Sequence, residues 1–229
     1  MKTFFRKYYT LEDLKRRFHR VKNQGCKKLI ISILILNRYN IMNNLKERIE
    51  WALHKPDDIT SQPNITKAEQ RKNHQENEKK WGNDMIGQTN NGQWTTLLGE
   101  RLVYDVLMLR DENPRRVVKK KGFEPDWETD DFIYEVKTSN WWVSGTAGEK
   151  VLGTWIKYQK VPTLYGKPLK IVVVANQEYE MEYGKTKYFG DHVTEKTRQV
   201  LDLAASWNIQ YIRFSELVAP LYNELINNS

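Results

Sequence analysis

Three residues near the middle of the chain have the types and the spacing that metal-assisted chemistry requires. Asp126 follows Pro125, and nine residues after Asp126 the tripeptide Glu-Val-Lys begins at Glu135 and ends at Lys137. Two carboxylates offer the hard oxygen ligands that Mg²⁺ prefers, and the carbonyl of Val136 is a further candidate ligand. An ammonium beside the ion can orient or help to deprotonate a water, or stabilise charge that develops on a phosphate. These groups are the minimum set for hydrolysing a phosphodiester.

The segments around these residues predict how they are positioned. Residues 132–136 are rich in β-branched and aromatic side chains and are predicted to form a strand. Side chains alternate along a strand, so Glu135 and Lys137 project from the same face. The acidic pair at 130–131 supplies a tight turn, and the spacing then fits Asp126 on an adjacent strand. Both acids and the lysine are therefore expected to meet beside one another.

The Glu-x-Lys tripeptide alone is a weak signal. About one copy is expected by chance in a chain of this size, and a second copy does stand at residues 78–80. That copy lies in a polar stretch, with no strand-like run around it and no Pro-Asp ahead of it. The alternative for Glu135 and Lys137 is a surface strand that carries an ion pair. The apolar run and Asp126 favour the catalytic interpretation.

The stretch from Pro125 to Lys137 resembles the PD-(D/E)xK nuclease family, to which many type II restriction endonucleases belong. The resemblance covers about residues 94–214 and implies a mixed central sheet flanked by helices. It also implies an auxiliary acid on a helix ahead of the motif, a position that Glu100 matches within the predicted helix 94–109. The activity it implies is Mg²⁺-dependent hydrolysis of double-stranded DNA by a homodimer at a specific palindromic site. The family also includes repair nucleases, junction resolvases and RNA-end-trimming enzymes, so a repair or junction-resolving role is an alternative.

Polar and basic residues near the motif are the candidates for contact with DNA. Hydroxyl and amide side chains directly after the catalytic lysine suit hydrogen bonds to phosphates and base edges. The polar candidates are Thr138, Ser139 and Asn140. The two tryptophans that follow them either contact DNA or pack on the core. The basic candidates are Lys119, Lys120, Lys121 and Lys150. A solvated turn and a surface ion pair are the alternatives for these lysines.

Positive charge is concentrated at one end of this chain of 229 residues, whose formal net charge is +8. Residues 1–80 hold 19 Lys and Arg against 9 Asp and Glu, whereas the rest is slightly acidic. Such a region suits a polyanion, since neutralising phosphates releases counterions. We expect a basic, mainly helical N-terminal region with a polar arm over 1–80, which clasps DNA or dimerises, and a catalytic core over 81–229. A solvated helix face is one alternative; a non-catalytic DNA-binding protein is the alternative from another functional class.

Several other classes lack the residues that they need. The single cysteine, Cys26, allows neither a disulfide within the chain nor a cysteine-based zinc site, and it suits a cytoplasmic, reducing compartment. The apolar run at 29–36 is about half the length needed to span a bilayer, so we interpret it as a buried segment. No Walker A pattern is present, and no nucleotide cofactor is expected. The four histidines are scattered, which disfavours a histidine-metal nuclease.

The remaining pattern predicts helices and strands in alternation, which indicates an α/β fold. Helices are expected at 10–22, 42–54, 94–109, 148–158 and 194–207. Strands are expected at 117–118, 132–136, 169–175 and 209–214. Residues 55–77 are polar and are expected to form a loop or an exposed arm. The alternating acids at 178, 180 and 182 are expected to form a solvent-facing strand edge.

Overall fold

The computed structural model describes residues 44–60, 63–142, 151–185 and 187–227. The chain divides after Asn44, and the structure reported below is that of the second unit, Leu45–Ser229. The predicted helix at 10–22 and the apolar run at 29–36 lie outside the described residues. None of the helices among the described residues is both long and apolar enough to cross a membrane.

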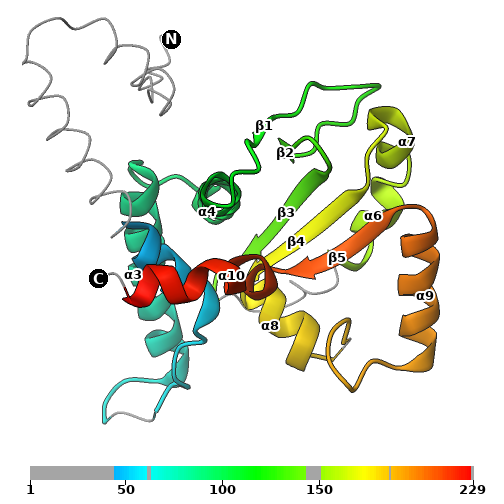
Figure 1. Cartoon of the computed structure of the whole chain (residues 1–229). Coiled ribbons are helices and arrows are strands. Elements are labelled where there is room, and N and C mark those ends of the chain that lie inside the picture. The colour runs from blue at the N-terminus through cyan, green and yellow to red at the C-terminus, as the bar shows by residue number, and fades with distance from the viewer. Residues whose placement is uncertain (1–43, 61–62, 143–150, 186, 228–229) are drawn as a thin grey trace, which may run out of the picture. The chain divides into compact units, whose positions relative to one another are not determined.

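A mixed five-stranded sheet forms the centre of this unit, in the order β1-β2-β3-β4-β5 (Figure 1). The strands are β1 (Arg115–Arg116), β2 (Trp127–Glu128), β3 (Ile133–Ser139), β4 (Leu169–Ala175) and β5 (Ile209–Arg213). β1, β2 and β3 pair antiparallel, whereas β3, β4 and β5 pair in parallel. Parallel strands are covered on both faces, which explains the continuous apolar run of β4. The predicted α/β fold with a mixed sheet flanked by helices is confirmed.

Helices cover both faces of the sheet (Figure 1). They comprise residues 44–53, α3 (Lys67–Ile86), α4 (Trp94–Leu109), α6 (Thr154–Lys157), α7 (Val161–Tyr165), α8 (Asn176–Tyr183), α9 (Glu195–Ser206) and α10 (Phe214–Asn227). Along β3 the side chains alternate between the two faces. Thr138 lies against Gly99 of α4 on one face, while Ile133 on the other face belongs to a core cluster with Trp155 and Val161. Odd-numbered residues of β3 therefore face α6 and α7.

The elements with a clear hydrophobic pattern are found where they are predicted. The helix at 94–109 and the strand at 169–175 have the predicted bounds, and the helix expected at 42–54 spans 44–53. The predicted cap of α9 is also present, since the Thr194 side chain accepts a hydrogen bond from the N–H of Thr197.

Two predicted strand positions are wrong. The short strand expected at 117–118 lies two residues earlier, as β1, because Val117 turns into the core cluster instead of continuing the pairing. The acids at 178, 180 and 182 belong to helix α8 and not to a strand edge. Glu178 is held there because its carboxylate accepts hydrogen bonds from the N–H and the hydroxyl of Ser215 at the start of α10.

Helix α3 occupies much of the stretch that was expected to be a loop or an arm. Its helical sequence offers no apolar stripe, and its buried residues are Gln70, Glu78, Gly82 and Asn83. Capping residues mark its ends: Thr66 and Glu69 form a capping box, and Gly87 ends the helix at φ 67°. The expectation of a polar arm over 55–77 is therefore wrong from Lys67 onward. α3 also runs through the expected boundary between residues 80 and 81.

Helix α4 lies close against the sheet at Gly99, and this contact gives a first prediction, for Gly99→Ala. A Cβ at Gly99 would lie 1.7 Å from Thr138 Oγ1, and Thr138 is held by the pairing of β3 with β4. Overpacking of this kind costs about 1–3 kcal/mol, which exceeds the gain of about 1 kcal/mol from helix propensity. We expect Gly99→Ala to lower the free energy of unfolding in urea by about 1 kcal/mol, the difference between these two effects. Gly92→Ala, with nothing within 4 Å of the added atom, is the control, and equal stability of the two variants would contradict this packing.

Candidate active site

The structure brings Asp126 and Glu135 together where β2 and β3 pair. Trp127 is the cross-strand partner of Tyr134, and the N–H of Asp126 donates to the Tyr134 carbonyl at 3.0 Å. Asp126 therefore lies beside the segment from Tyr134 to Val136, which includes Glu135. Its carboxylate oxygen Oδ2 accepts a hydrogen bond of 2.7 Å from the N–H of Val136. The carbonyl of Val136 lies on the same edge of the strand as this N–H, toward Asp126.

Lys137 lies beside the second acid on the same face of β3. Lys137 Nζ donates a hydrogen bond to Glu135 Oε1. The Glu135 side chain is buried, and its other oxygen, Oε2, has no hydrogen-bond partner among the described residues. A buried carboxylate oxygen without a donor is costly, which leaves this atom available to a ligand.

Glu100 brings a third acid to the edge of the site from α4. Its carboxylate accepts a hydrogen bond of 2.8 Å from Arg116, and its main-chain carbonyl accepts one of 2.9 Å from Trp127 Nε1. The Arg116 guanidinium in turn lies 4.1 Å from the centroid of the Trp127 ring. Burial, together with the charges of Glu135 and Glu100, raises the pKa of Asp126 to about 8. Glu100 is therefore close enough to act on the site electrostatically.

Crowding of the carboxylates predicts a pH dependence of the metal-free protein. The pKa of Asp126 rises from its ordinary value of 3.8 to about 8 on folding. Between these values the folded protein binds more protons than the unfolded chain, so Asp126 lowers stability progressively as the pH rises. Asp126→Asn removes the charge and keeps an acceptor for Val136. In EDTA we expect this variant to raise Tm at pH 8, and to raise it less at pH 5. An equal shift in Tm at both pH values would contradict the crowding.

The site suits a divalent cation that takes few protein ligands. Among the described residues, no three His, Cys, Asp or Glu side chains are arranged to hold one metal ion. The site instead offers two carboxylates and a main-chain carbonyl, and Mg²⁺ binds through one or two carboxylates while keeping several waters. A cation would satisfy the unpartnered oxygen of Glu135 and would neutralise the charge that raises the pKa of Asp126. The residues present therefore fit Mg²⁺.

Only part of the polar stretch after Lys137 lies on the catalytic face. Thr138 faces α4, and its hydroxyl is buried there without a partner among the described residues. Alternation along β3 therefore places Thr138 on the opposite face from Glu135 and Lys137, and its contact with DNA stays a prediction. Ser139 is buried on the catalytic side and its hydroxyl donates to the Asn140 carbonyl at 3.4 Å. Asn140 is partly exposed.

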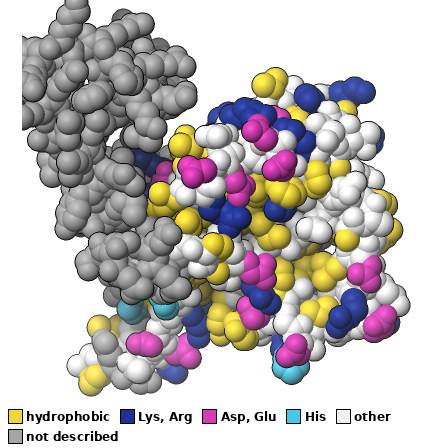
Figure 2. Space-filling model, viewed as in Figure 1, with side chains coloured by type: hydrophobic (Ala, Val, Ile, Leu, Met, Phe, Trp, Pro, Cys, Tyr) yellow, Lys and Arg dark blue, Asp and Glu magenta, His cyan; other side chains and the backbone are white. Residues whose placement is uncertain are grey.

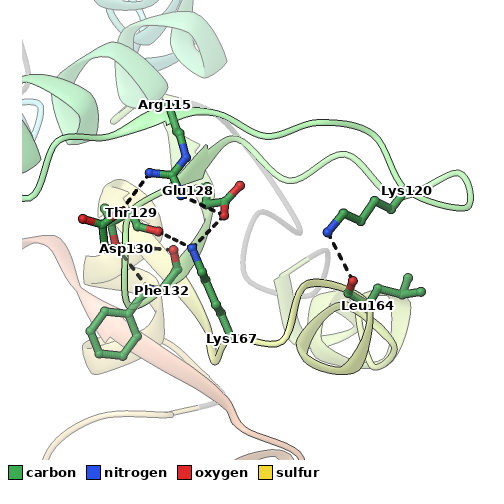
Figure 3. A network of polar contacts seen from close by, with 8 residues as sticks. All are labelled: Arg115, Lys120, Glu128, Thr129, Asp130, Phe132, Leu164 and Lys167. Atoms are coloured by element: carbon green, nitrogen blue, oxygen red, sulfur yellow. Dashed lines mark hydrogen bonds and ion pairs between the residues drawn. The ribbon is translucent and has the colours of Figure 1, made fainter.

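The lysine-rich loop after β1 is tied to α7. The Tyr165 hydroxyl donates to the carbonyls of Val118 and Phe123, at 2.9 and 3.0 Å. Lys120 donates to the Leu164 carbonyl at 3.4 Å and lies over the Tyr165 ring (Figure 3). The contacts of Lys120 therefore stabilise the loop itself. Of the other basic candidates, Lys119 places its Nζ 3.9 Å from Glu124 Oε2, and Lys121 is exposed. Lys150 lies outside the described residues. Figure 2 shows basic side chains, with acids among them, gathered over β1 and this loop.

Charged groups also fix the turn between β2 and β3. Lys167 Nζ donates to Glu128 and to the Thr129 carbonyl, each at 2.7 Å. Arg115 donates to Glu128 at 3.1 Å and to Asp130 at 3.0 Å (Figure 3). These contacts tie the end of β2 and the turn after it to β1 and to the residues just before β4, so they fix the turn through which β2 pairs with β3.

Tyr158 is a residue of the site that the sequence did not indicate. It follows α6 directly and is buried. Burial, followed by the charges of Glu135 and Asp126, raises the pKa of the Tyr158 hydroxyl. No motif marks this position, since a tyrosine after a short helix has no distinguishing spacing.

The second Glu-x-Lys copy has a structural role that was also not predicted. Glu78 Oε1 accepts hydrogen bonds from Trp51 Nε1 at 2.9 Å and from the N–H of Trp141 at 3.0 Å. Trp141 Nε1 donates to the Trp51 carbonyl at 2.8 Å, and Trp142 stacks on His74 with ring centroids 4.4 Å apart. Both tryptophans after the catalytic strand therefore pack on the helices.

The geometry thus brings Asp126, Glu135 and Lys137 together on β2 and β3, with Glu100 close enough to raise the pKa of Asp126. Comparison of the chain with family models, curated proteins and solved structures gives no match. The chemistry of these side chains is therefore the basis for assigning a function.

Proposed function

We propose that this protein is a Mg²⁺-dependent endonuclease of the type II restriction kind, which hydrolyses phosphodiester bonds in double-stranded DNA. The observation that carries the proposal is that Asp126 is hydrogen-bonded to the Val136 N–H directly beside Glu135, with Lys137 hydrogen-bonded to Glu135 on the same strand. The resemblance of the motif to PD-(D/E)xK nucleases supports it. The same resemblance supports a homodimer acting on a palindromic site.

Each residue has a role that follows from its position. Asp126 and Glu135 hold Mg²⁺, and the Val136 carbonyl is a further ligand. The bound ion supplies Lewis-acid stabilisation and lowers the pKa of a coordinated water. Lys137 keeps its proton at Nζ and moves from Glu135 Oε1 toward the attacking water or the scissile phosphate. Glu100 is an auxiliary acid that acts on the site through water.

Digestion of a DNA of known sequence, followed by mapping of the ends, tests the proposal. With Mg²⁺ we expect discrete fragments whose ends are symmetric about a palindrome, and with EDTA we expect no cleavage. Cleavage of branched DNA alone would favour the junction-resolving alternative. The basic region at 1–80 favours a second candidate, a non-catalytic DNA-binding protein. That candidate predicts salt-dependent binding without cleavage in any metal.

A further inference from the structure

Arg116 lies between the auxiliary acid Glu100 and the ring of Trp127. Its Nη2 donates to Glu100 Oε2 at 2.8 Å, and its guanidinium carbon lies 4.1 Å from the centroid of the Trp127 ring. Trp127 is the cross-strand partner of Arg116 on β2 and directly follows Asp126. The indole is fixed in turn, because its Nε1 donates to the Glu100 carbonyl at 2.9 Å. The guanidinium is therefore held beside the residue that follows a proposed metal ligand.

Most of the Arg116 side chain is nevertheless open to solvent. It is 61% exposed, whereas the Glu100 side chain is 13% exposed. Arg116 belongs to β1, which is the outermost strand at this edge of the sheet. A guanidinium carries five N–H donors, and among the described residues only the Nη2 of Arg116 has a hydrogen-bond acceptor. The other donors are therefore available to a ligand.

A phosphate of the DNA backbone is the ligand that suits this group. The planar fork of an arginine matches two phosphate oxygens, and stacking on an aromatic ring keeps the fork oriented. An exposed ion pair contributes little to stability, so a phosphate can replace Glu100 as the partner of Arg116 at small cost. Exposed lysines follow Arg116 in the chain, at Lys119 and Lys121, and extend the basic surface over β1 and the next loop (Figure 2).

We propose that Arg116 binds a phosphate of the DNA backbone at the edge of the candidate active site and releases Glu100 as it does so. This role rests on the proposed action on DNA. In the free protein Arg116 engages one oxygen of the Glu100 carboxylate. The exchange frees that oxygen for the role of Glu100 as an auxiliary acid. The alternative is an ion pair that only ties β1 to α4.

The affinity for a labelled DNA duplex in EDTA, measured at several KCl concentrations, tests the phosphate contact without cleavage. Each contact contributes about 0.9 to the slope of the logarithm of the association constant against the logarithm of the salt concentration. We expect Arg116→Ala to lower the magnitude of this slope by about 0.9 and to weaken binding by about 10–150-fold. Arg116→Lys keeps the charge but loses the fork and the ring contact, so it should keep the slope and bind more weakly than the wild type.

Arg198→Ala is the matched control. It removes an exposed arginine from α9, which packs on β5 at the opposite edge of the sheet. Both its slope and its affinity should equal those of the wild type.

A double-mutant cycle tests the release of Glu100. Glu100→Gln removes the charge that Arg116 must leave, and it also removes an acid near the DNA. The first effect requires Arg116, whereas the second does not. Glu100→Gln should therefore tighten DNA binding more in the wild-type background than in the Arg116→Ala background. Equal tightening in both backgrounds would show that Arg116 does not leave Glu100.

The outcomes separate this role from the proposed function. If Arg116→Ala has the slope and the affinity of Arg198→Ala, the phosphate contact is overturned and the nuclease proposal stands. If the wild type binds no duplex, in EDTA or with Ca²⁺, both are overturned. If Arg116→Ala shows the expected loss but the wild type cuts no DNA with Mg²⁺, the contact is supported and the nuclease proposal fails. A purely structural ion pair would change Tm and leave the slope unchanged.

Discussion

Asp126→Asn and Lys137→Ala should each slow Mg²⁺-dependent DNA cleavage by about 10²–10⁴-fold, the range for loss of a group that acts in the transition state. Asp126→Asn removes one of two carboxylates that hold the ion and keeps an acceptor for the Val136 N–H. Lys137→Ala removes the only cation that contacts Glu135 among the described residues. Plasmid cleavage at several Mg²⁺ concentrations measures both effects. Excess Mg²⁺ should restore part of the activity of Asp126→Asn and none of that of Lys137→Ala.

Matched controls lie on the surface. Asp130→Asn removes an acid from the turn of the same hairpin, where its side chain is 81% exposed, and Lys196→Ala removes an exposed lysine of α9. Both controls should cut at close to the wild-type rate. The site is wrongly assigned if Asp126→Asn and Lys137→Ala cut as fast as these controls. A melting temperature for each variant separates loss of chemistry from loss of fold.

The second large effect is expected on stability, at Glu78. Glu78→Ala leaves the Trp51 Nε1–H and the Trp141 N–H without their acceptor. A buried donor without a partner costs about 1–3 kcal/mol, so the free energy of unfolding should fall by about 2–5 kcal/mol for the two. Denaturation in urea measures this loss. The m-value, which is the dependence of the free energy of unfolding on urea concentration, should be unchanged because the buried surface is nearly the same.

Two further variants isolate the cause of this loss. Glu78→Gln keeps a carbonyl acceptor and removes the charge that burial disfavours, as the raised pKa of Glu78 indicates. It should therefore be less damaging than Glu78→Ala. Glu76→Ala removes an exposed acid from the same helix and should change stability by less than about 0.5 kcal/mol. Equal stability of Glu78→Ala and Glu76→Ala would show that the two tryptophan contacts are not formed.

The sequence predicts the fold well wherever burial is apolar. α4 and β4 have their predicted bounds because their buried side chains follow the pattern of a helix and of a buried strand. α3 escapes prediction because the side chains that it buries, such as Glu78 and Asn83, are polar. Its N-terminus was nevertheless readable from the capping box at Thr66 and Glu69.

The candidate site, like the fold, could be predicted only in part from the sequence. The spacing of Asp126, Glu135 and Lys137 predicts their proximity because it depends only on a hairpin and on alternation. The same alternation already excludes Thr138 from the catalytic face. Tyr158 was not predictable, since its approach to Glu135 depends on how the chain between β3 and β4 packs across the sheet.

The strand that carries Glu135 and Lys137 pairs antiparallel on one side and in parallel on the other, and its two connections differ in length accordingly. The turn to β2 spans residues 129–132, whereas the chain from β3 to β4 runs through residues 140–168. Short loops close quickly, so the two acids can meet early in folding, before the crossover brings Tyr158 to them. Doubling the length of a flexible loop costs only about 0.6 kcal/mol. Insertions that leave α6 and α7 packed on the sheet can therefore accumulate in the crossover during evolution while the acidic pair keeps its geometry.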